Sequence, residues 1–171
     1  RSTQSRSSAA SDLYKRQLWD SVDLGFKPTK RTWGAEVFPG SSLPNAMVQV
    51  SPVTKFHSGA GYQYEDSVIY GFTHTNKGHW NLCHIPLLPV TGTPTPGDYC
   101  SPFSHERESA APGYYQVFLD RYGVDAQLSS TLRCAFHKYT YPAGAAASLL
   151  ADLQRSNEHV RAWDIRKEGD N

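Results

Sequence analysis

The sequence predicts an all-β fold, an antiparallel β-sandwich, from two observations. Short stretches of β-branched, aromatic and aliphatic residues recur at intervals of roughly ten residues, and turn-forming Gly, Pro, Asn and Asp residues separate them. No pattern typical of a normal-length helix lies between these strands, which argues against a parallel α/β sheet. A length of 171 residues is sufficient for one domain with a sizeable core.

The chain is organised around residues 67–89, where two apolar stretches flank a polar tip. Residues 68–72 and 82–88 each have the composition of a buried strand. Polar and aromatic side chains are concentrated between them, at His74, Asn76, Lys77, His79 and Trp80. Because two rigid strands would present these groups together, the tip is the best candidate for a binding site.

The clearest hairpin lies at residues 114–129. Residues 114–119 and 124–129 alternate between apolar and polar side chains, and residues 120–123 form the turn. This alternation is typical of antiparallel strands with one buried face. Further strands are expected at residues 47–50, 133–141, 146–153 and 160–166, the first of them closed by Ser51 and Pro52.

The two ends of the chain are predicted to differ in structure. Residues 1–16 are predicted to be a disordered leader or linker, although residues 12–20 could form one short helical turn. The sandwich is expected over residues 17–171. Its last strand has no closing element after it, and natural domains avoid an open sheet edge, so we expect the sandwich to be incomplete at its C-terminal end.

Composition narrows the class of protein. The hydrophobic fraction of 39% and the charged fraction of 19% are typical of soluble globular proteins. Seventeen Lys and Arg against sixteen Asp and Glu give a net charge of +1, which argues against a nucleic-acid partner. No apolar run is long enough to span a membrane, and no export signal begins the sequence. Three cysteines do not establish the compartment or any disulfide.

Two groups of residues resemble chemical sites but have simpler interpretations. His74, His79, Cys83 and His84 match none of the usual zinc spacings, so we expect no metal site. Cys83 is better explained by buried packing than by nucleophilic catalysis.

Glu106 and Glu108 would point to the same face of a strand, as a carboxylate pair for acid/base catalysis might. A solvated rim explains them more simply. The aromatic residues are more informative, because Trp33 and Trp80 lie in predicted turns. A sugar site needs an exposed ring for the pyranose C–H face and polar groups for its hydroxyls, and for Trp80 this interpretation and core packing both stay open.

Several motifs together resemble the N-terminal domain of glycoside hydrolase family 92, a family of α-mannosidases. The resemblance runs in the correct order from about residue 22 to residue 171. It is carried by Val-Phe-Pro-Gly-Ser-Ser-Leu-Pro at residues 37–44, Ile-Tyr-Gly-Phe-Thr-His-Thr at 69–75, Phe-Ser-His-Glu at 103–106, Pro-Gly-Tyr-Tyr at 112–115 and Phe-His-Lys-Tyr-Thr-Tyr-Pro at 136–142.

The resemblance implies part of an exo-acting, inverting, calcium-dependent α-mannosidase that hydrolyses mannose-containing glycans. In that family a larger C-terminal (α/α) barrel holds the general acid, the general base and the calcium ligands. None of the barrel is in this chain, so the chain alone is expected to be inactive and to hold no catalytic residue and no metal ligand. The resemblance also implies a secreted, periplasmic or cell-surface location.

The resemblance further implies that this domain adds substrate contacts at the interface with the barrel, on the leaving-group side of the mannose site. The substrate-binding residues expected there are Trp80, His79, Lys77, His74, Trp33 and Glu36. Residues 32–36 and 76–81 depart from the commoner family pattern, which leaves the linkage and the aglycone open. The alternatives are a free-standing carbohydrate-binding module without hydrolase activity and a purely structural sandwich.

Overall fold

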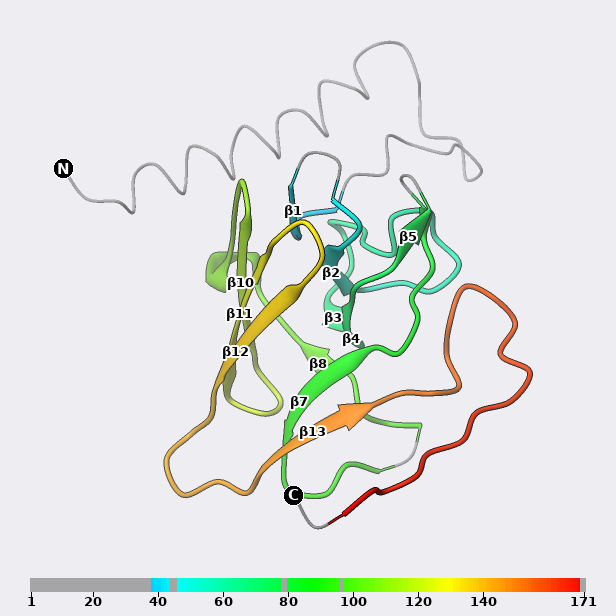
Figure 1. The fold of residues 1–171 in the computed structure, drawn as a ribbon. Coiled ribbons are helices and arrows are strands. Elements are labelled where there is room, and N and C mark those ends of the chain that lie inside the picture. The colour runs from blue at the N-terminus through cyan, green and yellow to red at the C-terminus, as the bar shows by residue number, and fades with distance from the viewer. Residues whose placement is uncertain (1–37, 44–45, 78–79, 96, 170–171) are drawn as a thin grey trace, which may run out of the picture.

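The computed structural model of the chain describes residues 38–43, 46–77, 80–95 and 97–169, and this part is almost entirely β (Figure 1). The leader predicted at residues 1–16 and the helical turn predicted at residues 12–20 lie outside the described residues. All strand pairs in the described part are antiparallel. The predicted all-β, antiparallel fold class is therefore confirmed.

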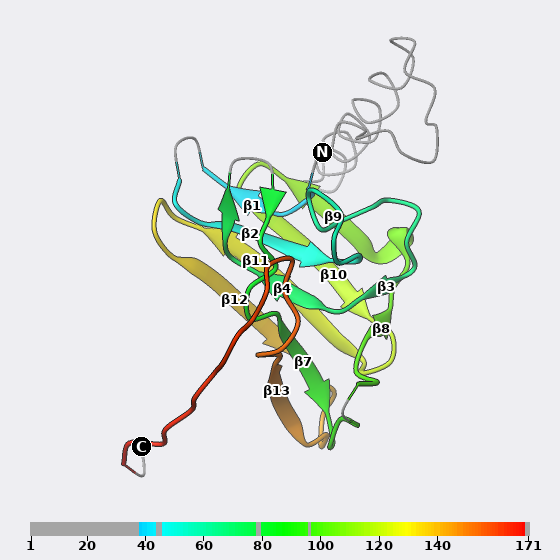
Figure 2. The same ribbon diagram turned by 90° about the vertical axis from the view of Figure 1, so that its right-hand side faces the viewer.

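Two sheets lie face to face. The five-stranded sheet contains, in spatial order, β1 (Ser41–Ser42), β2 (Gln49–Val53), β4 (Gly71–Thr73), β7 (Leu87–Thr91) and β13 (Ala147–Ala151). The four-stranded sheet contains, in spatial order, β12 (Ala135–Thr140), β11 (Val124–Ser130), β10 (Tyr114–Leu119) and β9 (Glu108–Ala111). Figure 2 shows the five-stranded sheet in front of the four-stranded one.

Shorter elements lie between the strands of the two sheets. β3 (Val68–Ile69) pairs with β8 (Ser101–Pro102), and β5 (Asn76–Lys77) pairs with β6 (Trp80–Asn81) as a small hairpin. One 3₁₀ helix, η1 (His105–Arg107), leads directly into β9. No helix in the described ranges is long and apolar enough to cross a membrane.

The core lies between the sheets and follows the alternation of the predicted hairpin. The residues of β10 and β11 that point inward are buried, and they are Tyr115, Val117, Leu119, Val124, Ala126 and Leu128. Strand β11 continues as far as Ser130 and pairs with β12 on its other side. Burial of these side chains is the main stabilising contribution in a sandwich of this kind.

Several sequence-based boundaries were wrong. Residues 82–88 are not one strand, because Cys83 (φ 52°) and Ile85 (φ 47°) adopt the left-handed conformation, so β7 begins only at Leu87. Residues 160–166 form no strand and extend away from the sheets (Figure 2). β2 also runs through Pro52, which lacks an N–H, because β1 pairs with β2 only at residues 49 and 50.

Candidate functional site

The polar tip forms the hairpin of β5 and β6, in which Lys77 lies opposite Trp80 and Asn76 lies opposite Asn81. The Trp80 side chain is half-buried. Only the backbone of Lys77 is described. Of the other predicted site residues, His79, Trp33 and Glu36 lie outside the described residues, so the structure brings together only part of the expected set.

The fully buried Asn81 side chain anchors the hairpin to its neighbours by hydrogen bonds. Its Oδ1 accepts hydrogen bonds from the Cys83 backbone N–H (2.7 Å) and the Thr73 hydroxyl (3.1 Å). The Asn81 backbone N–H donates to the Gly59 carbonyl at 2.7 Å. These bonds join the hairpin to β4 and to a neighbouring loop. The backbone that carries Trp80 is therefore fixed by its own neighbour in the sequence.

A residue distant in the sequence supports the same hairpin. Asn157, which follows β13, donates from its backbone N–H to the Leu82 carbonyl (2.9 Å) and from Nδ2 to the Asn81 carbonyl (2.7 Å). Its Oδ1 accepts from the His57 N–H at 2.6 Å. This role of Asn157 was not predicted from the sequence. A lone Asn in a polar segment gives no pattern from which it could be predicted.

His74 lies at the base of the hairpin and contacts the other sheet. Its Nε2 lies 2.7 Å from Nε2 of His137 on β12, and Nδ1 of His137 lies 2.6 Å from the Tyr139 hydroxyl. Burial lowers the pKa of His74. Burial, with a smaller repulsion from His74, lowers the pKa of His137 to about 4. A neutral pair sharing one N–H satisfies this geometry, and the pair joins the two sheets.

Near the same end of the molecule, buried amide groups lack partners. In the described part of the chain, both polar side-chain atoms of Asn76 and the Oε1 atom of Gln49 are buried without a hydrogen bond. Such groups destabilise a fold by about 1–3 kcal/mol each. A hydrogen-bond partner from outside the described residues would remove that cost.

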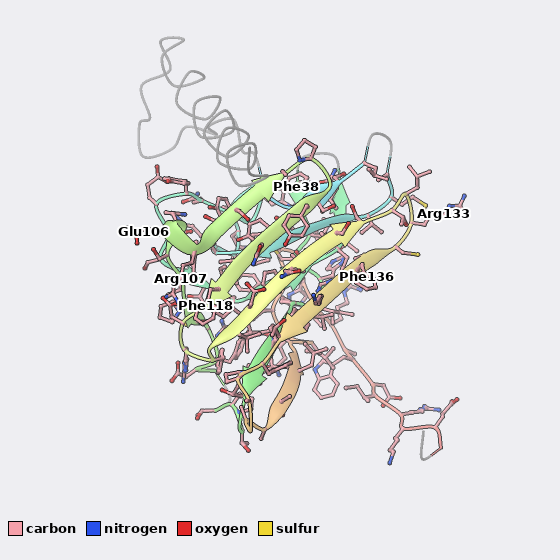
Figure 3. The ribbon with its side chains drawn as sticks, turned by 90° about the vertical axis from the view of Figure 1, so that its left-hand side faces the viewer. Phe38, Glu106, Arg107, Phe118, Arg133 and Phe136 are labelled. Atoms are coloured by element: carbon pink, nitrogen blue, oxygen red, sulfur yellow. The ribbon has the colours of Figure 1, made fainter. Side chains whose placement is uncertain are left out.

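The structure contradicts the prediction that Glu106 and Glu108 share one face of a strand, and the interpretation as a solvated rim holds for Glu106 only. Glu106 belongs to η1 and is exposed at the margin of the four-stranded sheet (Figure 3). Glu108 begins β9, and its side chain is only 8% exposed. The two carboxylates therefore differ in environment and share no face.

Glu108 is instead the acceptor at the centre of a buried network. Its carboxylate accepts hydrogen bonds from the hydroxyls of Tyr62 (3.0 Å) and Tyr115 (2.8 Å) and contacts Nδ1 of His105. The other ring nitrogen of His105 lies 2.7 Å from the Tyr64 carbonyl, which can only accept. All the polar groups are thus used inside the domain, and the network has a structural role.

The cysteines show no reactive site. Cys83 is buried, as expected from the sequence, and burial raises the pKa of its thiol to about 12, so the thiolate is not formed near neutral pH. Cys100 and Cys134 are also free thiols. Within the described ranges, no three His, Cys, Asp or Glu residues come close enough together to hold a metal ion.

Comparisons with known proteins agree with this architecture. The model of the glycosyl hydrolase family 92 N-terminal domain matches residues 26–171. A solved GH92 α-mannosidase from Bacteroides thetaiotaomicron, in complex with mannoimidazole, is 32% identical with a TM-score of 0.65, and the match covers 71% of this chain and 18% of that chain. A search of curated proteins found no match.

Two other solved structures are similar. The GH92 glycosyl hydrolase ccman5 is 33% identical with a TM-score of 0.61, over 71% of this chain and 19% of that chain. A GH92 inverting mannosidase from Bacteroides thetaiotaomicron VPI-5482 is 27% identical with a TM-score of 0.58, over 68% of this chain and 17% of that chain. The chain thus spans less than a fifth of the length of these solved enzymes.

Proposed function

Because this chain belongs to glycosyl hydrolase family 92, as its N-terminal domain, we propose that it is the substrate-contacting part of an exo-acting, inverting α-mannosidase that hydrolyses mannose-containing glycans. The observation that carries the proposal is the family match over residues 26–171. The similar solved structures support it, since they are described as an α-mannosidase and as an inverting mannosidase.

The site chemistry supports a binding role for this domain and a catalytic role for the rest of the enzyme. Inverting hydrolysis needs two carboxylates far enough apart to admit a water molecule. Among the described residues, the former candidates do not meet this need, because the Glu108 carboxylate is occupied by Tyr62, Tyr115 and His105. We place the general acid and base in the C-terminal (α/α) barrel that the family resemblance implies.

The proposal includes calcium dependence of the full-length enzyme. The described residues do not fit a calcium site, because they offer no cluster of oxygen ligands from three or more acidic side chains. As the family resemblance implies, we propose that the calcium ligands lie outside this chain. A secreted, periplasmic or cell-surface location follows from the family resemblance and is part of the proposal.

The binding surface that we propose is the hairpin tip. Asn81 and Asn157 fix the backbone immediately after Trp80, so that its indole is attached at a defined place on the domain. A fixed indole offers a stacking face to a sugar, and the predicted neighbours Lys77 and His79 would supply donors for its hydroxyls. Trp33 and Glu36 are proposed to extend the same wall.

The test is a substrate and stereochemistry assay of the full-length protein. We expect it to release single mannose units from aryl α-mannosides and mannose disaccharides, with the β-anomer seen first by NMR, and to lose activity with a calcium chelator. An aryl α-glucoside is the control. Release of the α-anomer would exclude inversion, and glycan binding without hydrolysis would support the carbohydrate-binding module instead.

A further inference from the structure

A shallow hollow of about 480 Å³ lies away from the hairpin tip, between the loop after β2 and the segment after β13. Its lining includes two aromatic rings, two permanent cations, a histidine and an amide, which belong to Phe56, Tyr70, Lys55, Arg155, His57 and Gln154. Neither Trp80 nor His74 lines it. The mixture of rings, cations and an amide is the composition of a polar ligand site.

The Arg155 guanidinium is held in this hollow by aromatic rings. Its central carbon lies 5.2 Å from the centre of the Tyr99 ring, 5.6 Å from that of Tyr70 and 5.9 Å from that of Phe56. In the described part of the chain the guanidinium donates no hydrogen bond, and its nearest acidic neighbour, Asp152, lies 3.9 Å away. The rings fix the orientation of the group but leave its N–H donors unused.

Asp152 forms a long ion pair with the guanidinium, 3.9 Å from Arg155 Nε to Asp152 Oδ2, without a hydrogen bond to it. Its Oδ1 accepts from the backbone N–H groups of Gln154 (2.8 Å) and Arg155 (3.0 Å), and its Oδ2 accepts from the Tyr99 hydroxyl. Burial acts to raise the pKa of this carboxyl, but the hydrogen bonds that it accepts, together with a smaller attraction from the Arg155 charge, outweigh burial and lower it. Asp152 thus fixes the backbone of Arg155, and both of its carboxylate oxygens already accept hydrogen bonds from other groups.

The rim of the hollow adds a second cation. The exposed Lys55 ammonium donates one hydrogen bond, to Gln63 Oε1 at 3.2 Å, and has further N–H groups to offer. The nearby Asp66 carboxylate accepts from the Thr54 hydroxyl at 2.8 Å. Lys55 therefore adds a positive charge with unused donors to the lining of the hollow.

We propose that this hollow binds the carboxylate of an acidic sugar residue, such as a uronate. A planar carboxylate accepts two parallel hydrogen bonds from a guanidinium, which is the geometry that a ring-held Arg155 presents. Lys55 supplies the second charge, and the exposed amide of Gln154 is placed for a sugar hydroxyl. That the carboxylate is carried by a sugar rests on the proposed function, whereas the carboxylate chemistry rests on the described side chains.

The experiment is a calorimetric titration of the full-length protein with glucuronate, acetate, inorganic phosphate and uncharged glucose. We expect saturable binding of glucuronate, weaker binding of acetate and phosphate, and no binding of glucose at this site. Arg155→Gln should weaken glucuronate binding by about tenfold or more, and Lys55→Gln by a few-fold, because each removes a charge-assisted hydrogen bond. Arg161→Gln, which changes an exposed arginine outside the hollow, should have no effect.

Three results would overturn the proposal: no glucuronate binding, glucuronate binding no stronger than acetate binding, or binding unaffected by both substitutions in the hollow. Arg155→Gln could disturb the packing of Phe56 and Tyr70, so Lys55→Gln, at an exposed position, provides the independent test. The assay on mannosides uses different ligands and a different surface. A failure of mannosidase activity is therefore distinguishable from a failure of carboxylate binding.

Discussion

Two polar side chains, the buried Glu108 and the half-buried His137, show how single residues organise the domain. Glu108 gathers two tyrosine hydroxyls and a histidine around one carboxylate, and His137 joins β12 to His74 beyond the end of β4. In an interior of low dielectric, such groups stabilise a fold only while all their partners are present. Removing one member should therefore cost more than its own hydrogen bond.

Glu108→Ala should lower the free energy of unfolding by about 2–4 kcal/mol, because the hydroxyls of Tyr62 and Tyr115 would lose their buried acceptor. Glu106→Ala is the matched control, since the exposed Glu106 side chain lies only two residues away. Urea unfolding followed by circular dichroism measures both. Equal effects of the two substitutions would show that the Glu108 network does not carry this stability.

The His74–His137 pair should make stability depend on pH. The pKa of His137 in the folded protein is about 4, below its ordinary value of 6.5, so the unfolded chain takes up the proton first as the pH falls. Stability should be constant above about pH 7 and should fall by about 1–2 kcal/mol between about pH 6.5 and 4, after allowance for solvent screening.

Denaturant midpoints measured across this pH range check the expectation. His137→Gln should flatten the decrease, whereas His159→Gln, at an exposed histidine, should leave it unchanged. A decrease of the same size in His137→Gln would assign the pH dependence to other groups.

At the scale of elements, the sequence predicts those strands whose side chains alternate. The hairpin of β10 and β11 was predicted with nearly its observed bounds, because one face of each strand is buried. Residues 82–88 were wrongly predicted to form one strand. Cys83 and Ile85 adopt a left-handed backbone conformation, which cannot be predicted from their apolar side chains. Apolar composition alone does not distinguish a buried loop from a buried strand.

The candidate site was predictable only in part, because some of its contacts join residues that are far apart in the sequence. The polar tip and its aromatic residue are visible in the sequence as a local cluster, and the structure forms a hairpin there. The support from Asn157 and the pairing of His74 with His137 depend on residues 76 and 63 positions away from their partners. Contacts at such separations follow from the packing of the sheets and leave no local pattern.

In the full-length enzyme, Trp80→Ala should lower kcat/KM on mannose disaccharides by about 1–3 kcal/mol of transition-state binding, because the leaving sugar would lose its stacking surface. The kcat/KM on an activated aryl mannoside that does not use this subsite should stay unchanged. Kinetic assays of both substrates measure the difference. Phe136→Ala is the matched control, since this exposed ring lies on the outer face of the four-stranded sheet (Figure 3).

Equal losses of kcat/KM on the two substrates, together with a lower Tm, would mean that Trp80 belongs to the core of the domain. That outcome would support the structural interpretation of the hairpin. It would also remove Lys77 and His79 from the proposed leaving-group subsite.

At the scale of the whole molecule, apolar side chains are exposed on and after the edge strand β13. Leu149, Trp163 and Ile165 are 53%, 56% and 68% exposed. One edge of β13 pairs with β7, and among the described strands none pairs with its other edge. Exposed apolar groups beside an open strand edge favour association.

The isolated 171-residue chain should therefore self-associate or melt without a sharp transition. Sedimentation velocity over a range of concentrations and a calorimetric melt test this expectation. A strict monomer with a sharp cooperative melt would contradict it. Leu149→Lys should reduce any association, whereas Thr140→Lys, on the outer face of the other sheet, should not.

The central proposal is that this domain contributes substrate binding and that other residues of the enzyme carry out catalysis. The decisive measurement is the hydrolysis of an aryl α-mannoside and a mannose disaccharide, with calcium present, by the purified 171-residue chain and by the full-length protein. We expect turnover by the full-length protein and none by the isolated chain. Turnover by the isolated chain that disappears on substitution of Glu106 or Glu108 would contradict it.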